Sequence, residues 1–176
     1  MAQRDKDLLN FDCANARSVV DKIGSVITAF EENALQFMLL TETWLTRKHC
    51  SPRALNDLTI GANLSFIRRD RGSRGGGVAI CYDPTKIKMH MYSPANNVST
   101  KGELVCAIGT TTLTKRKIVT ISVYLPPAMK VGEVEETLEN IISTVDQIKV
   151  KYSDPILIVE GDFNNQSILT LSLIHI

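Results

Sequence analysis

Polar residues that suit chemistry on a phosphate follow the most apolar run of this sequence. Residues 156–159 read Ile-Leu-Ile-Val, and Asp162 and Asn164 come shortly afterwards. A run of this length and composition predicts a strand that is buried on both faces. Residues two apart in an extended chain project to the same side, so Asp162 and Asn164 are expected to face one pocket while Phe163 turns away into packing.

Two other polar residues occupy similar positions. Asn15 follows a short mixed run over residues 8–13, and Glu42 follows the apolar run 37–40. Open α/β sheets bind ligands at the ends of their strands, which predicts that Asn15, Glu42 and Asp162 converge. The oxygens of Asn15 and Glu42 suit Mg²⁺ or Mn²⁺, and a carboxylate such as that of Asp162 can activate a water molecule.

Each of these residues also has an ordinary structural explanation when it is taken alone. An Asn after a strand is commonly a turn or cap residue, and a Glu at a strand end is commonly solvated. Asp162 could equally form an Asx-turn. The prediction of a site therefore depends on their occurrence together.

The periodicity of the remaining chain indicates an α/β layered sandwich with a mixed β-sheet. Apolar residues at helical spacing predict helices over residues 19–32 and 133–150. Ser18 and Asp21 read as a capping-box variant at the start of the first helix.

Hairpins and single strands account for most of the rest. A hairpin is expected from strands at 66–69 and 78–82, whose connection DRGSRGGG contains glycines that permit left-handed turns. A second hairpin is expected over residues 103–124 and a strand over 87–92. Residues 48–63 read as a loop with room for a short helix.

Length and composition favour one ordinary globular domain. The chain has 176 residues, of which 44% are hydrophobic, and its net charge of +1 provides no bulk attraction to nucleic acid or to a membrane. The cysteines are scattered without the spacing of a zinc site, which favours reduced intracellular thiols. With no signal-peptide pattern and no apolar run of membrane-spanning length, we expect a protein of the nucleus or cytoplasm.

Five motifs, in order, resemble the endonuclease/exonuclease/phosphatase superfamily. They are NARS at Asn15, LLTETWL around Glu42, RRDRGSRGGGVAI from Arg68, VYLPP at Tyr124 and ILIVEGDFN ending at Asn164. The series is most similar to the endonuclease domains of LINE-type retrotransposons, which are relatives of the apurinic endonucleases. The resemblance covers about residues 8–165 and implies a truncated, DNase I-like four-layer fold, of which residues 1–165 form the N-terminal half.

The resemblance implies a role for each matching residue. Asn15 and Glu42 match metal-site positions, with Glu42 the direct ligand of Mg²⁺ or Mn²⁺. Tyr124 matches a tyrosine that approaches the scissile phosphate, although alone it could be a tyrosine at the edge of the core. Asp162 matches the carboxylate that orients or deprotonates the attacking water, and Asn164 matches an amide that holds a phosphate oxygen. DNA is the implied substrate, with no membrane partner and with a reverse transcriptase domain in a parent polyprotein as a further expectation.

The resemblance does not extend to the second half of the family's fold. That half supplies further strands and a terminal Ser-Asp-His motif, whereas His49, His90 and His175 lie in no such motif. We therefore expect little or no activity from the chain as given, and exposed apolar strand surface. Residues 166–176 are expected to be a non-native tail, of which 171–176 resemble a translated sequencing-adapter end.

Basic residues cluster in two of the predicted hairpins. Those of the first hairpin could contact the phosphate backbone of DNA or could simply be solvated loop charges, and those of the second, Lys115 to Lys117, are the weaker candidates. The residues of the first cluster are Arg68, Arg69, Arg71 and Arg74. Trp44 is expected to pack beneath the metal loop rather than to stack on a base, and Glu103 is expected to be a strand residue without a role.

Two alternatives to a DNA endonuclease stay open from the sequence. The same metal and phosphate groups would serve a phosphatase or phosphodiesterase acting on lipid or inositol phosphates. A degenerate, non-catalytic binding module is the other alternative, and the missing second half motivates it.

Overall fold

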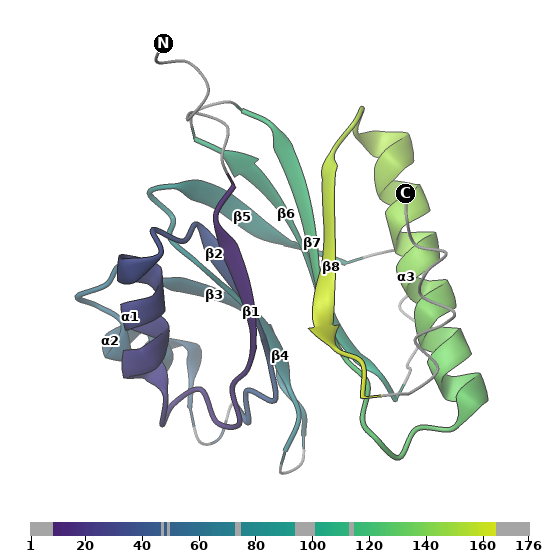
Figure 1. Cartoon of the computed structure of the whole chain (residues 1–176), viewed down its shortest axis with the longest axis horizontal. Helices are drawn as coiled ribbons and strands as arrows, with labels where there is room; N and C mark the ends of the chain where they lie inside the picture. The colour runs from purple at the N-terminus through teal and green to yellow at the C-terminus, as the bar shows by residue number, and fades with distance from the viewer. Residues whose placement is uncertain are drawn as a thin grey trace.

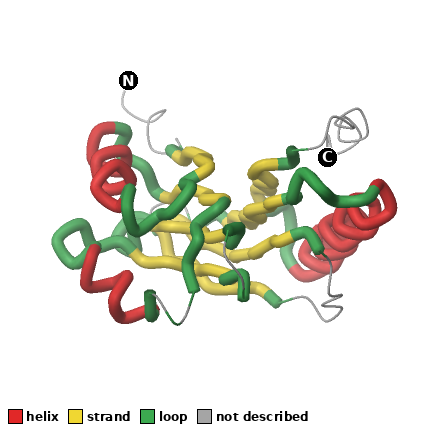
Figure 2. Tube along the Cα trace, turned by 90° about the horizontal axis from the view of Figure 1, so that it is seen from below, coloured by secondary structure: helices red, strands yellow, loops and turns green. Residues whose placement is uncertain are grey.

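The computed structural model describes residues 9–46, 48, 50–72, 75–93, 101–112 and 115–164. These residues form four layers, in which two β-sheets packed face to face are covered by helices on their outer sides (Figures 1 and 2). The expected α/β sandwich with four layers is confirmed, but its strands divide into two mixed sheets rather than one. Arg74 and the tail 166–176 lie outside the described residues, so the expectations about them stay predictions.

The first sheet has the strand order β1-β2-β4-β3 and is covered by the helices α1 and α2. β1 is parallel to β2, and β4 is antiparallel to both β2 and β3. The bounds are β1 Phe11–Asn15, α1 Ile23–Glu32, β2 Phe37–Thr41, α2 Pro52–Leu58, β3 Ser65–Arg69 and β4 Val78–Tyr82. All five residues of β2 are buried, as its apolar sequence predicts for a central strand covered on both faces.

The second sheet has the strand order β5-β6-β7-β8 and is covered by the helix α3. β5, β6 and β7 are antiparallel to their neighbours, whereas β8 is parallel to β7. The bounds are β5 Ile87–Tyr92, β6 Glu103–Thr111, β7 Lys117–Tyr124, α3 Val131–Lys151 and β8 Ile156–Asp162. Both predicted hairpins and the long amphipathic helix are thus confirmed, with small shifts in their ends.

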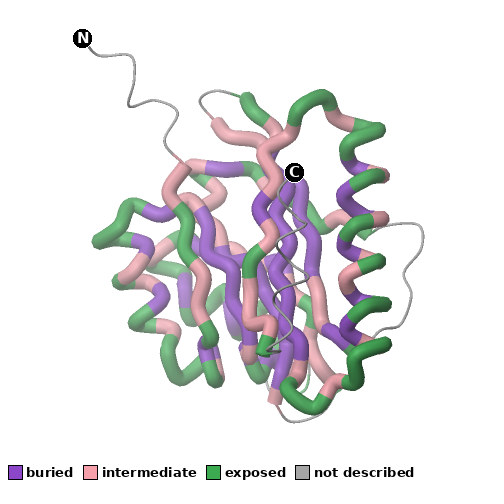
Figure 3. The backbone as a smooth tube through the Cα atoms, turned by 45° about the vertical axis from the view of Figure 1, so that its right-hand side comes forward, coloured by how far each residue is buried: buried purple, intermediate pink, exposed green. Residues whose placement is uncertain are grey.

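Three apolar layers hold the four layers of secondary structure together. One lies between the first sheet and α1 and α2, one lies between the second sheet and α3, and the third lies between the two sheets. The buried strands at the centre contrast with the helices, which are exposed along their outer faces (Figure 3). Phe37, Leu39 and Ile80 of the first sheet pack in this middle layer against Ile118 and Ile158 of the second.

The first helix begins four residues later than its periodicity predicts. Ser18 has a φ of +81°, and its hydroxyl donates a hydrogen bond to the carboxylate of Asp21 at 2.5 Å instead of capping a helix. Val19 donates its N–H to the carbonyl of Thr43 at 3.0 Å, which ties this segment to the residues after β2. The predicted capping box is therefore wrong, because tertiary hydrogen bonds use the groups that would start a helix at Val19.

No helix in the described ranges combines the length and the apolar character needed to cross a membrane.

Gly161 allows β8 to approach β7 just before Asp162. A Cβ at this position would lie 1.9 Å from the carbonyl oxygen of Val123, its partner in β7. We predict that Gly161→Ala lowers the free energy of unfolding by about 3 kcal/mol, the upper end of typical overpacking penalties, as measured by urea denaturation. The matched control is Gly132→Ala in α3, where nothing lies within 4 Å of the new methyl group. Equal stability of the two variants would contradict the prediction.

Candidate active site

Parallel strand pairs in each sheet bring the predicted residues to one edge of the molecule. Asn15 ends β1 and pairs in register with Thr41, so Glu42 comes directly after the same edge. In the other sheet Tyr124 ends β7 and pairs in register with Asp162, which ends β8. Because the sheets pack face to face, Asn15 and Glu42 of the first sheet lie opposite Tyr124 and Asp162 of the second sheet.

Two side-chain hydrogen bonds cross from sheet to sheet at this edge. The Asn15 amide donates from Nδ2 to Oδ2 of Asp162 at 2.8 Å. The Tyr124 hydroxyl donates to Oε1 of Glu42 at 3.1 Å. The structure thus brings Asn15, Glu42, Tyr124 and Asp162 together, although they lie as far as 147 positions apart in the chain.

Asp162 is held through both carboxylate oxygens. Oδ2 accepts the hydrogen bond from Asn15, and Oδ1 accepts one from the main-chain N–H of Asn164 at 3.2 Å. The bond from Asn164 is the contact of an Asx-turn, which the sequence analysis gave as an alternative explanation of Asp162. Each carboxylate oxygen has two lone pairs, so Asp162 can still accept a hydrogen bond from a water molecule.

Asn164 does not share an extended strand with Asp162. β8 ends at Asp162, and Asn164 follows with a φ of +39°. The prediction that alternation places both side chains on one face is therefore wrong for Asn164, because the chain turns before reaching it. Phe163 does pack against the layer beneath α3, as expected.

Backbone strain concentrates in the loops around these residues. A positive φ is uncommon for a residue with a Cβ, and residues held in this way cluster at functional sites. Of the nine non-glycine residues with positive φ in the described ranges, five follow the ends of β1, β2 or β8: Arg17, Ser18, Glu42, Trp44 and Asn164.

Burial raises the pKa of Tyr124 from 10.0 to about 12. The hydrogen bond to Glu42 and the negative charges of Glu42 and Asp162 act in the same direction, since they disfavour a tyrosinate, while Arg71 opposes them. Tyr124 consequently keeps its proton at neutral pH and donates it to a hydrogen bond.

Glu103 belongs to this site, which the sequence did not predict. It starts β6, pairs in register with Tyr124, and accepts a hydrogen bond from the main-chain N–H of Gly77. Its carboxylate also forms an ion pair with Nε of Arg71. Burial raises the pKa of Glu103, although Gly77 and Arg71 act to lower it. The only sequence signal was its place in GELVCAI, opposite VYLPP of the next strand.

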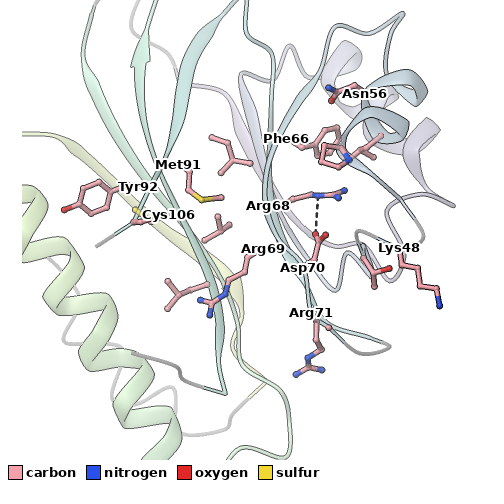
Figure 4. Close-up of a pocket in the computed structure, with 18 residues that line it drawn as sticks. Lys48, Asn56, Phe66, Arg68, Arg69, Asp70, Arg71, Met91, Tyr92 and Cys106 are labelled. Carbon is pink, nitrogen blue, oxygen red and sulfur yellow. Dashed lines mark ion pairs between the residues drawn. The ribbon is translucent and has the colours of Figure 1, made fainter. Parts of the chain in front are cut away.

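The arginines of the first hairpin have different surroundings. Nε of Arg68 lies 3.2 Å from Oδ1 of Asp70 (Figure 4). Nη2 of Arg68 donates a hydrogen bond to the carbonyl of Cys50 at 2.7 Å, so the guanidinium links β3 to the segment before α2. Arg69 is exposed and points from β3 to the opposite side (Figure 4). Arg68, Arg69 and Arg71 all line a cavity of about 960 Å³ beside β3 and β6, which none of the predicted metal and catalytic residues lines. Arg69 and Arg71 also line a second cavity, of about 500 Å³, together with Glu103.

The second basic cluster lies away from the site. Lys117 starts β7 whereas Tyr124 ends it, so Lys115 to Lys117 lie at the opposite edge of the sheet. Eight residues of strand separate the two ends by about 23 Å at the usual rise per residue.

Trp44 was expected to pack beneath the loop that carries Glu42, and this prediction is wrong. Its side chain is 42% exposed, while Thr43 and Leu45 on either side of it are buried. The φ of +54° at Trp44 and the hydrogen bond from its N–H to the carbonyl of Gly76 at 2.9 Å fix the backbone in this position. With both neighbours inward, the indole faces outward.

The donor groups at this edge fit a hard divalent cation. Among the described residues, no group of three or more His, Cys, Asp or Glu side chains is placed to hold a metal ion. Mg²⁺ usually takes one or two carboxylates and keeps several water molecules, so Glu42 and the amide oxygen of Asn15 would be enough to hold it with water. Glu42 has one carboxylate oxygen that no described hydrogen bond uses.

Solved structures with the same fold are endonuclease/exonuclease/phosphatase proteins. A family member from Bacteroides thetaiotaomicron is 14% identical with a TM-score of 0.68, and the alignment covers 94% of this chain and 68% of that one. A mannosyl-6-phosphatase from the same organism is 14% identical with a TM-score of 0.67, covering 91% and 68%. D. rerio TDP2, complexed with a single-strand DNA product, is 14% identical with a TM-score of 0.60, covering 94% and 64%.

The chain therefore has the endonuclease/exonuclease/phosphatase fold and spans about two thirds of the length of these structures. No protein-family model matches its sequence, and a comparison with curated proteins finds no match. At such low identity the likeness is one of fold, and the activity is argued below from the site.

Titration of the Tyr124 hydroxyl tests its hydrogen bond to Glu42. We expect Tyr124 to ionise near pH 12, and Glu42→Gln to lower its pKa because the variant removes the negative charge beside the hydroxyl. Ultraviolet difference titration of wild type and variant, with Tyr124→Phe to assign the signal, would measure both values. The control is Glu135→Gln on the exposed face of α3. An unchanged Tyr124 pKa in Glu42→Gln would show that the contact does not form.

Proposed function

We propose that the chain provides the metal-binding and phosphate-binding part of a Mg²⁺-dependent phosphodiester hydrolase that cleaves DNA, of the kind found in LINE-type retrotransposons. The observation that carries the proposal is the pair of hydrogen bonds, Asn15 to Asp162 and Tyr124 to Glu42, that joins the two sheets at one edge. Hydrolysis of a phosphodiester needs a positioned water, a hard cation and neutralisation of charge on the phosphate. A bound Mg²⁺ would polarise a phosphate oxygen and neutralise its charge.

The side chains divide this work. Glu42 and Asn15 supply oxygens for the cation, and the Tyr124 hydrogen bond orients the Glu42 carboxylate. Asp162, fixed by Asn15 and Asn164, accepts a proton from the attacking water and sets its direction. Tyr124 stays protonated at neutral pH, so its hydroxyl is a hydrogen-bond donor beside the site of reaction.

DNA is the preferred substrate because of the order of the motifs and the basic residues beside the site. TETWL around Glu42 and YLPP from Tyr124 resemble the retroelement endonucleases, and Arg69 and Arg71 line a cavity of about 500 Å³ together with Glu103. The single-strand DNA product bound by the similar D. rerio structure also supports DNA. The similar mannosyl-6-phosphatase supports the second candidate, a phosphatase acting on a small phosphate ester.

Plasmid nicking tests the reaction. We expect the chain, supplied with a C-terminal half of the same fold, to nick supercoiled DNA in Mg²⁺ and not in EDTA. Glu42→Gln and Asp162→Asn should each reduce the rate by about 10² to 10⁴, the usual contribution of a general base or a comparable group. Phosphoinositides and mannose 6-phosphate are the alternative substrates. Nicking unaffected by both substitutions, or faster turnover of a small ester than of DNA, would contradict the proposal.

The salt dependence of DNA binding tests the assignment of the arginines. Each phosphate contact adds about 0.9 to the slope of log K against log salt for duplex DNA, so Arg69→Ala should weaken binding and reduce that slope by about one. Arg68→Ala should instead lower thermal stability, because Arg68 bonds Asp70 and the carbonyl of Cys50. Fluorescence anisotropy at several salt concentrations, with thermal melts of both variants, distinguishes the two arginines. An unchanged slope in Arg69→Ala would exclude its phosphate contact.

A further inference from the structure

Glu103 reaches from the second sheet to the first. Its side chain is only 12% exposed, and its two oxygens are engaged by Gly77 and Arg71, which lie in the connection between β3 and β4. Burying a carboxylate costs free energy, and its partners here offset that cost. An apolar residue would fill this position without the free-energy cost of burying a charge. The carboxylate of Glu103 therefore has a role other than packing.

The glycines of this connection fit closely between Glu103 and the loop that follows β2. A Cβ on Gly76 would lie 2.7 Å from Oε1 of Glu103, and a Cβ on Gly77 would lie 2.4 Å from Oγ1 of Thr43. Both glycines have positive φ, +68° and +88°. Neither position can therefore accept a side chain without moving Glu103 or Thr43.

The same glycines hold the backbone on the C-terminal side of Glu42. Thr43 donates its N–H to the carbonyl of Gly77 at 3.1 Å, and Trp44 donates its N–H to the carbonyl of Gly76 at 2.9 Å. The carbonyl of Glu42 accepts a hydrogen bond from Ser18 at 3.1 Å on the other side. Glu42 thus keeps its strained φ of +48° between two flanking segments, and Glu103 anchors one of them.

We propose that Glu103 is a positioning residue that sets the Glu42 loop for cation binding by anchoring Gly76 and Gly77. The inference deepens the proposed function and rests on it. Glu103 acts through the main chain of the loop and does not contact the cation. Its ion pair with Arg71 fixes the carboxylate against the glycines, and the guanidinium retains four other N–H donors beside Tyr124.

The single tryptophan of the chain provides a direct probe, because Trp44 lies two residues from Glu42. We expect Glu103→Ala to increase acrylamide quenching of Trp44 emission, since the loop loses its anchor. We also expect Mn²⁺ to bind about tenfold more weakly, a typical effect of removing a residue that orients a metal ligand. Glu103→Gln should show a smaller effect because it keeps an oxygen for the N–H of Gly77. Glu135→Ala on the exposed face of α3 is the matched control.

A double substitution separates positioning from general destabilisation. In the Glu42→Gln background, Glu103→Ala should cause little further loss of Mn²⁺ affinity, because both changes act on one ligand. Additive losses, or unchanged quenching and affinity in a folded Glu103 variant, would overturn the proposal. If Glu103→Ala does not fold, Trp44 quenching and Mn²⁺ affinity are measured in Glu103→Gln and Gly76→Ala instead, and both variants should change in the same direction. If the wild type binds no Mn²⁺, the proposed function fails, and Trp44 quenching still decides whether Glu103 sets the loop.

Discussion

The packing of two sheets face to face is the constraint on which the candidate site depends. β2 and β4 of the first sheet lie against β6 and β7 of the second, and apolar side chains fill the layer between them. The side chains of this layer are mostly buried and interdigitate as in other protein interiors, so the sheets keep one register relative to each other. A buried hydrogen bond from the Ser122 hydroxyl to the carbonyl of Leu40 at 3.3 Å crosses the same layer. Strand ends that belong to different sheets therefore meet in one defined arrangement.

Three polar contacts between the sheets lie at the edge that carries the candidate site. Asn15 with Asp162, Tyr124 with Glu42, and Glu103 with Gly77 all cross there from one sheet to the other. The strained residues after β1, β2 and β8 lie at the same edge. Strain of this kind persists only where the surroundings fix it, and here the fixed surroundings are the two packed sheets. The edge combines rigid support with irregular loops, which is the usual arrangement of a catalytic site.

The nature of the groups at this edge narrows the chemistry they can perform. Carboxylate and amide oxygens suit a hard cation, the protonated Tyr124 is a donor, and Arg69 and Arg71, which line a cavity with Glu103, suit an anionic substrate. Such a set serves phosphate esters of several kinds, which is consistent with a fold shared by a mannosyl-6-phosphatase and a protein bound to a DNA product. The outward-facing Trp44 adds an aromatic surface two residues from Glu42, on which a nucleobase could stack and which a small sugar phosphate would not need.

The sequence by itself determined the elements and the identities of four of the site residues. Apolar runs predict where the strands lie and that Asn15, Glu42 and Asp162 follow strand ends, because side-chain alternation is a local property. Tyr124 was identified through the resemblance of VYLPP. It did not determine that the strands form two sheets, that Ser18 leaves the helix uncapped, that Trp44 faces outward or that Glu103 joins the site. Each of these depends on a partner distant in the chain: Thr43 for Val19, Gly76 for Trp44, and Gly77 with Arg71 for Glu103. Hydrogen bonds between distant segments can override local propensity, and only the packing of one sheet on the other brings those segments together.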